Sequence, residues 1–408
     1  MIDEPGPWGT GPFTLVQGAS SILTRNVVMD QDPYTASWII ESEDRSPQVV
    51  LEANLSHWNR EARGPRIHRA VFRNDLSPAE ALDRCCDGDG EVDIVAEVGS
   101  GDAARVKASE HARLVSINAN RNLSCIINRG ASDVPLHDVN VRKALNMAVD
   151  RKRLVDDGFH GYATPLPAFT PDWCAGFPAG AAPYPHDPAQ ARSLWAEGDW
   201  PAGRPVRIAA TGSFVGVADM LAADIREALR VDVDVLTIGD DQVIPGTRRL
   251  MEKKLEQPWD LLVHAWFDLS SEAPPAAVHR EFFGRDGAFR AGPVDEGFDE
   301  LFAEMAVQLD GDRLVEVAER IDQYCFDNAL ALFLCAPQAL YAVNNHVEFG
   351  PYRTTFEIAE VTVDQDHWSR LSGSSGWPSG SEGSAVPVSK REEWQARPGF
   401  SGATGNAC

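Results

Sequence analysis

The stretch HAWFDLSSEAPP, residues 264–275, places an aromatic side chain and two carboxylates directly after an apolar segment. The preceding run WDLLVHAW is apolar through its middle and is typical of a buried strand, so its end is the first point where side chains reach a cleft. There Trp266 offers a flat apolar wall, and Asp268 and Glu272 offer negative charge to a cationic or amine-bearing solute. The alternative for the two carboxylates is a solvated surface loop. We therefore expect ligand binding at this strand end.

Sequence motifs of known catalytic sites are absent from the chain. It has no Gly-x-Ser-x-Gly elbow, no His-Glu-x-x-His pair and no phosphate-binding P-loop. DGDGEVD, residues 87–93, has the turn residues of a calcium loop without the ligand spacing of an EF-hand. The seven cysteines are scattered and form no cluster typical of zinc. We expect a protein that is not an enzyme and that needs no cofactor and no metal.

Composition limits the kinds of partner that the chain can bind. It has 408 residues, of which 43% are hydrophobic and 24% charged, and its formal net charge is −24. Nucleic acids and anionic membranes are bound by basic surfaces, so the acidic balance argues against both as partners. No run approaches the roughly 18 apolar residues of a membrane-spanning helix. The odd number of unclustered thiols favours a reducing compartment.

The residues that lead to this strand end alternate between helix and strand. The expected order is helix 187–200, strand 204–211, helix 215–230, strand 231–238, helix 246–257 and strand 258–267. Such alternation predicts a sheet that is covered by helices on both faces and is substantially parallel. The strand that carries Trp266 is therefore expected to belong to a helix-covered sheet.

A series of segments between residues 9 and 343 resembles, in its order, the family 5 extracellular solute-binding proteins. These are the dipeptide, oligopeptide and nickel receptors of bacterial ABC importers. The most specific segment is Asp-x-x-Val-Arg-x-Ala-Leu-x-x-Ala-x-Asp-Arg at residues 138–151. The others include GTGPFTLV, VVLEANLSHWN, IHRAVFRN, GEVDIV, GYATP, YPHDPAQARSLWAEGDWPAG, WDLLVHAWFD and ALFLCAPQALYAV.

The resemblance implies an α/β, two-lobe periplasmic-binding-protein-like fold of type II, cluster C. Lobe I is expected to comprise residues 1–151 and return strands at 337–369, and lobe II residues 152–336. The Ser/Gly/Pro-rich segment 370–408 is expected to be a disordered tail. Compared with the family, the fold is expected to be N-terminally shortened, without a signal peptide or the N-terminal subdomain. A partner chain is then expected to cover the exposed edge of lobe I.

The resemblance also assigns roles to residues of the ligand site. Trp266 matches an aromatic wall residue, and Asp268 or Glu272 takes the place of an Asp that pairs with a ligand amine, although SSEAPP replaces the family's Asp-Pro pair. Asn128 matches an Asn at the end of a lobe I strand that faces the cleft. Its alternative is a turn residue at the strand end. These four residues are the predicted ligand-binding set.

Two further residues are expected to be structural. His264 lies within an apolar strand and is expected to be a core histidine. Arg142 lies on a helix, where it is expected to pair with Asp138 one turn away.

The function implied by the resemblance is that of the substrate-binding component of an ABC-type uptake system for peptides or similar small solutes. Its partners would be a small-molecule or peptide ligand and an ABC permease, and its location periplasmic or extracellular. The alternative is a shortened cytoplasmic paralogue that acts as a ligand sensor, a partner-binding subunit or a recruited enzyme. The missing leader and the odd thiol count motivate this alternative.

Overall fold

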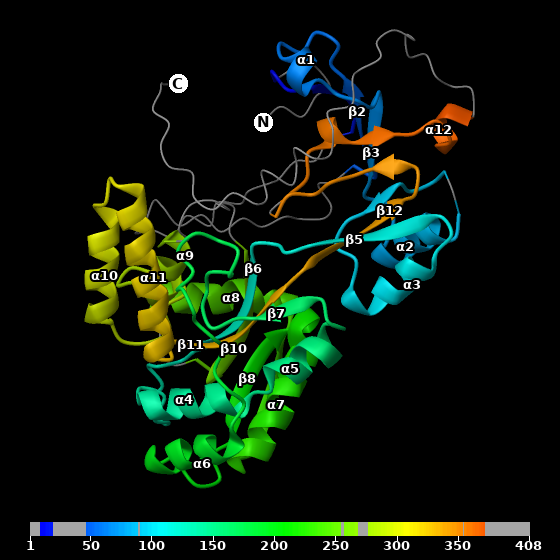
Figure 1. Ribbon diagram of the computed structural model, residues 1–408. Helices are drawn as coiled ribbons and strands as arrows, with labels where there is room; N and C mark the ends of the chain where they lie inside the picture. The colour runs from blue at the N-terminus through cyan, green and yellow to red at the C-terminus, as the bar shows by residue number, and fades with distance from the viewer. Residues whose placement is uncertain are drawn as a thin grey trace. The chain divides into compact units, whose positions relative to one another are not determined.

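The chain folds into two compact units, which the computed structural model in Figure 1 shows. Unit 1 consists of Met1–Ala119 and Gln338–Trp377, and unit 2 is built on Asn120–Pro337. The structure describes residues 9–18, 46–88, 90–253, 257–267, 276–353 and 355–371. The predicted tail lies outside the described residues from position 372 onward, and residues 370 and 371 end a short helix, α12 (Trp368–Leu371).

The first boundary between the units differs from the predicted lobe boundary. The chain enters unit 2 at Asn120, so residues 120–151 belong to unit 2 and not to the unit that precedes them. The reason is strand pairing over a long sequence distance, because β6 (Arg121–Ile127) forms ladders with β10 (Leu261–Phe267) and β11 (Ala331–Pro337). No local pattern in residues 120–151 reveals these partners.

Unit 1 contains short helices and short strands, and the strands form small antiparallel sheets. The remaining elements of this unit are β1 (Phe13–Gln17), β2 (Gln48–Ala53), α1 (Arg60–Arg63), β3 (Arg69–Arg73), α2 (Pro78–Cys86), β4 (Ile94–Val95), α3 (Ala103–Ala108), β5 (Ala112–Ile117), β12 (Ala339–Asn344), β13 (Val347–Glu348) and β14 (Thr362–Val363). Strands β1, β2 and β3 form one sheet, β4, β12 and β5 another, and β13 pairs with β14. Helix α2 starts where the sequence predicts, since Ser77 and Glu80 form a capping box ahead of Pro78.

Unit 2 contains a six-stranded sheet with the order β7-β11-β6-β10-β8-β9. Its other elements are α4 (Val139–Ala148), α5 (Arg151–Arg153), β7 (Ala163–Pro165), α6 (Pro188–Glu197), β8 (Val206–Thr211), α7 (Val215–Leu229), β9 (Val233–Ile238), α8 (Asp240–Met251), α9 (Ala276–Phe283), α10 (Glu296–Ala306) and α11 (Gly311–Asp327).

This sheet is mixed, and the prediction of a substantially parallel sheet is wrong. Strands β9, β8 and β10 are parallel to one another because helical crossovers connect them. Strand β6 is antiparallel to both β10 and β11, and β11 is antiparallel to β7. Strands β6 and β11 are the two through which the chain enters and leaves unit 2, so no crossover helix fixes their direction.

Helices cover both faces of the sheet, as the alternation predicts (Figure 1). Alternate side chains of β6 divide between the two cores, because successive residues of a strand point to opposite faces. Leu123, Cys125 and Ile127 pack in the core with α4, α6 and α7, whereas Ile126 packs in the core with α9, α10 and α11. Within the described residues, no helix has both the length and the apolarity to cross a bilayer.

Arg142 is structural, but it does not pair with Asp138 as predicted. Asp138 caps α4 by accepting a hydrogen bond from the backbone N–H of Asn140. Arg142 is 5% exposed, and its guanidinium donates to four backbone carbonyl oxygens, those of Leu136, His137, Asn328 and Ala329. Burial lowers the pKa of Arg142 to about 10. The side chain therefore ties the start of α4 to the turn between α11 and β11.

Candidate functional site

Trp266 lies at the end of β10, where it pairs across the sheet with Asn122 of β6. Direct cross-strand partners project to the same face, so both side chains point toward the layer of α9 and α11. The Trp266 indole is partly buried and packs edge-on against the ring of Phe282, with 5.3 Å between centroids and 87° between planes. Phe289 lies 6.4 Å away on the same indole. Two phenyl rings therefore fix the orientation of the indole.

Five buried polar atoms around this strand end have no hydrogen-bond partner among the described residues. They are Trp266 Nε1, Asn122 Oδ1, Asn120 Nδ2, Thr170 Oγ1 and Asp322 Oδ2. Leaving a buried polar group unpaired costs about 1–3 kcal/mol, so such atoms are uncommon. The set contains both donors and acceptors, so it can pair with the acceptors and donors of a molecule that carries amide or carboxyl groups.

Hydrogen bonds connect Asn122 and Asp322 through the segment 168–170. The Asn122 side-chain amide donates to the carbonyl oxygens of Ala168 (3.1 Å) and Phe169 (2.9 Å). The backbone N–H of Phe169 donates to Asp322 Oδ1 (3.3 Å), and Thr170 follows it directly. Asp322 Oδ1 also lies 2.6 Å from His279 Nε2. Strand β6, the segment 168–170, α9 and α11 therefore all contribute to the surroundings of the Trp266 strand end, which we call the β10-end site.

His264 lies two residues before Trp266 and projects to the same face. Its ring packs against Phe282 and Phe289, each 5.5 Å away between centroids. Burial lowers the pKa of His264 to about 4, because the charged imidazolium loses its hydration there. The imidazole is therefore neutral near pH 7 and acts as an aromatic packing group, as the sequence predicts.

The predicted site residues do not all come together. Asp268 and Glu272 lie outside the described residues. Asn128 follows the far end of β6, where its backbone N–H donates to the Asp260 carbonyl and its side-chain amide to the Trp259 carbonyl (3.3 Å). At about 3.3 Å per residue along a strand, Asn128 and the partner of Trp266 are separated by roughly 20 Å. Asn128 is 1% exposed and holds two strand ends together, as a turn residue does.

Sequence reasoning missed Asn122, Thr170 and Asp322. One signal was present for Asp322, which falls on the buried stripe of α11 between Ala318 and Cys325. A carboxylate on the apolar face of an amphipathic helix is rarely buried unless it is paired, so its position there indicates a buried polar partner. Asn122 is likewise a polar residue inside an otherwise buried strand. Neither pattern identifies the partner, which only the folded chain supplies.

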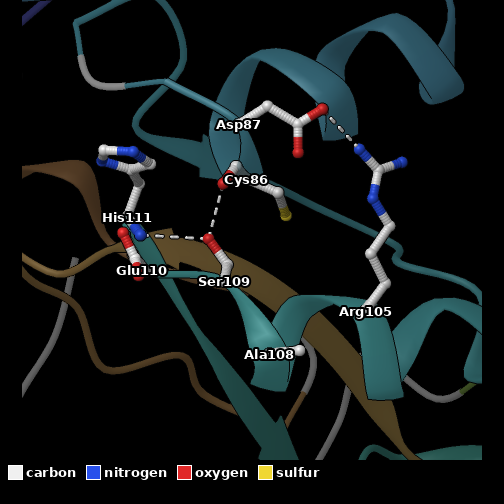
Figure 2. Close-up of a pocket in the computed structure, with 7 residues that line it drawn as sticks. All are labelled: Cys86, Asp87, Arg105, Ala108, Ser109, Glu110 and His111. Carbon is white, nitrogen blue, oxygen red and sulfur yellow. Dashed lines mark hydrogen bonds and ion pairs between the residues drawn. The ribbon is translucent and has the colours of Figure 1, made fainter.

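A hollow of about 440 Å³ lies in unit 1 and is shown in Figure 2. It is lined by Cys86, Asp87, Arg105, Ala108, Ser109, Glu110 and His111. Arg105 is already paired with Asp83 (2.6 Å) and Asp87 (2.9 Å), and Ser109 Oγ donates to the Cys86 carbonyl (2.6 Å). Burial raises the pKa of the Cys86 thiol, so the thiolate is disfavoured. The polar groups here hold the local fold together and do not form a reactive centre.

Comparison with known proteins gives a family for the chain. The sequence profile of bacterial extracellular solute-binding proteins, family 5 Middle, matches residues 4–282. The glutathione-binding protein GsiB of Salmonella choleraesuis is 36% identical over 101 residues, which are 23% of this chain and 20% of GsiB. The nickel-binding periplasmic protein of Escherichia coli is 22% identical over 298 residues, 66% of this chain and 53% of that protein. The chain thus spans about half the length of the nickel-binding relative.

Solved structures give the same answer for the fold. The ABC transporter substrate-binding protein CtaP of Listeria monocytogenes superposes with a TM-score of 0.69 at 17% identity, over 87% of this chain and 67% of that one. The predicted α/β, periplasmic-binding-protein-like fold is confirmed, and so is the predicted family. Family 5 is a family of solute-binding proteins. The chain belongs to family 5 of the bacterial extracellular solute-binding proteins.

Proposed function

We propose that this chain is the substrate-binding component of an ABC-type uptake system for peptides or similar small solutes, with the β10-end site as part of its binding surface. The observation that carries the proposal is the group of unpaired buried donors and acceptors around Trp266. A peptide backbone has one N–H and one C=O per residue and can pair with both kinds of atom. The indole supplies an apolar surface for stacking against a side chain of the solute.

The proposed solute carries an amine or another positive charge. Asp268 and Glu272 follow β10 within six residues of Trp266, so their carboxylates are candidates for pairing with a ligand ammonium. The net charge of −24 favours the approach of cations, and this long-range effect weakens as salt rises. Among the relatives, GsiB is named for a tripeptide and the E. coli protein for nickel. A peptide is the solute class that fits both the unpaired atoms and the aromatic wall.

The proposed location and partner follow from the family. Family 5 proteins are extracellular, and we propose a periplasmic or extracellular protein that delivers its solute to an ABC permease. The cytoplasmic alternative stays a prediction without support of its own. Cell fractionation of the native organism tests it, since recovery in the cytosol would contradict the transport role.

Ligand-induced thermal stabilisation tests the binding site. The purified protein is screened against dipeptides and tripeptides, including glutathione and matched lysine- and glutamate-containing dipeptides. Trp266→Ala is expected to abolish the shift in unfolding temperature, whereas Trp58→Ala, at a Trp that is 78% exposed in unit 1, is expected to keep it. Asp268→Asn combined with Glu272→Gln is expected to weaken the lysine-containing dipeptide more than the glutamate-containing one. Binding that is unaffected by Trp266→Ala and by the combined Asp268→Asn and Glu272→Gln substitutions would place the site elsewhere.

A further inference from the structure

Three side chains that commonly bind metals gather at the end of the β13–β14 ladder in unit 1. They are His346, Asp364 and Asp366. One imidazole nitrogen and one oxygen from each carboxylate all lie within 4.8 Å of one another. Among the described residues, no other trio of His, Cys, Asp and Glu side chains meets this spacing. The trio belongs to a different unit from the β10-end site and does not depend on the function proposed for that site.

The strand register places the first two residues of the trio opposite each other. Val347 pairs with Val363, so His346 and Asp364 are the next partners along the ladder. The backbone N–H of Asp364 donates to the His346 carbonyl at 3.0 Å, which continues the ladder to this rung. Asp366 follows two residues later, and its backbone N–H donates to Asp364 Oδ1 at 2.9 Å. The backbone therefore brings all three side chains to one end of the ladder.

The chain around the trio is held by contacts that do not involve the three side chains. Arg113 donates to the carbonyls of Asn344 (2.8 Å) and Val347 (2.6 Å), which clamps the turn that carries His346. Asn344 Oδ1 accepts the backbone N–H of His346 at 2.8 Å. After Asp366, the Trp368 indole donates to Asp93 at 2.9 Å. A site with its backbone fixed on both sides loses little conformational freedom when an ion binds.

The distances between His346 and Asp364 fit adjacent ligands of one metal ion. His346 Nδ1 lies 3.0 and 3.2 Å from the two carboxylate oxygens of Asp364. Two bonds of about 2.1 Å at a right angle put their ligand atoms about 3.0 Å apart, so an ion can replace the shared proton without moving the strands. The Asp366 carboxylate has no hydrogen-bond or ion-pair partner among the described residues and is exposed, so it is free to rotate onto the same ion.

We propose that His346, Asp364 and Asp366 bind one divalent first-row transition-metal ion on the surface of unit 1. The imidazole ligand argues against Mg²⁺ and Ca²⁺, because these ions prefer oxygen ligands. A set of one imidazole and two carboxylates suits Zn²⁺ and neighbouring transition-metal ions. The two carboxylates balance the charge of the ion, and water fills the positions that face solvent. The bound ion links β13 to the segment after β14 and reinforces a ladder with only two residue pairs.

Zn²⁺ is the probe for the test. Chelator-stripped, reduced protein is titrated with Zn²⁺ by calorimetry, with His186→Ala as the matched control. His186 is 38% exposed and lies 3.6 Å from Asp150, whereas His346 is 37% exposed beside Asp364, so the two variants each remove one exposed His of a His–Asp pair. We expect one ion per chain, with affinity reduced on the order of tenfold or more by His346→Ala and by Asp366→Asn. The control is expected to bind as the unchanged protein does.

Spectroscopy separates this site from binding by the thiols. Co²⁺ in the proposed site gives only weak d–d bands, whereas a cysteine ligand adds intense thiolate-to-metal charge transfer. The absence of stoichiometric binding, a charge-transfer band, or binding that survives both substitutions would overturn the proposal. Asp366→Asn keeps the test decisive if His346→Ala disturbs folding, because the Asp366 carboxylate makes no contact that the local fold needs. Circular dichroism of each variant checks the fold.

Discussion

Trp266 and Asn122 are direct partners across the β10–β6 ladder, and each ends in a buried polar atom without a partner among the described residues. The indole N–H of Trp266 is a donor, and the side-chain amide oxygen of Asn122 (Oδ1) is an acceptor. The two atoms do not satisfy each other, although their residues are neighbours. In the proposed binding role, a solute supplies both partners.

Trp266→Phe separates the hydrogen bond of this residue from its packing. The phenyl ring keeps most of the contact with Phe282 and removes the buried donor, so the free energy of unfolding is expected to change by less than about 1 kcal/mol. Affinity for a peptide found in the screen is expected to fall up to about tenfold, because one hydrogen bond to the solute is lost. Calorimetric titration and chemical denaturation measure the two effects.

Trp200→Phe is the matched control for this substitution. The Trp200 indole donates to the Arg204 carbonyl at 2.7 Å, so its loss is expected to lower stability by about 1 kcal/mol without changing peptide affinity. Equal peptide affinity of Trp266→Phe and the unchanged protein would show that the indole N–H does not contact the solute.

Asp322→Ala is expected to lower the free energy of unfolding by about 3 kcal/mol. The carboxylate is fully buried and accepts from the Phe169 N–H while lying 2.6 Å from His279, so truncation leaves buried groups without a partner. Asp327→Ala on the same helix is the control, because that carboxylate is exposed and its one hydrogen bond within the described part of the chain is from Gln323. Urea denaturation compares the two. A similar, small effect of both changes would mean that the His279–Asp322 contact contributes little.

Arg142→Met is expected to lower the free energy of unfolding by about 3 kcal/mol. The substitution keeps much of the side-chain volume but leaves four carbonyl oxygens without their donor. Lys143→Met, at the adjacent and less buried position, is expected to change stability by less than about 0.5 kcal/mol. Thermal unfolding of both variants checks the difference, and equal transition temperatures would contradict the structural role of Arg142.

Acidification is expected to destabilise unit 2 through His264. The pKa of His264 is about 4 in the folded chain and has its ordinary value of 6.5 in the unfolded chain. Between pH 4 and 6.5 the unfolded state therefore binds more protons than the folded state. The contribution of neutral His264 is complete above pH 6.5 and is lost as the pH falls toward 4, by up to about 3 kcal/mol.

His264→Leu removes this titration from the chain. The loss of stability between pH 7 and pH 4.5 is expected to be smaller in this variant than in the unchanged protein, as measured by denaturation at each pH. The same acid sensitivity in His264→Leu and in the unchanged protein would exclude His264 as its source.

Much of the local structure follows from the sequence. Ser77 with Pro78 and Asp187 with Pro188 mark helix starts, and each cap forms as the pattern indicates. The alternation after Asp187 predicts helices on both faces of a sheet, and the cores on its two faces confirm this. The ordered series of family segments is also local, because each segment is contiguous. These features depend on residues close together in the chain, where capping geometry and hydrophobic periodicity act directly.

Long-range pairing decided the rest. The pairing of β6 with β10 and β11 placed residues 120–151 in unit 2, put Asn122 rather than Asn128 beside Trp266, and made the sheet mixed. The buried stripe of α11 indicates that Asp322 faces a core, but the contact with His279 requires α9 and α11 to pack on the same face. His346 and Asp364 likewise meet only through the β13–β14 register. A strand's sequence records which of its faces is buried but not which other strand lies beside it, because backbone hydrogen bonds are the same for every partner.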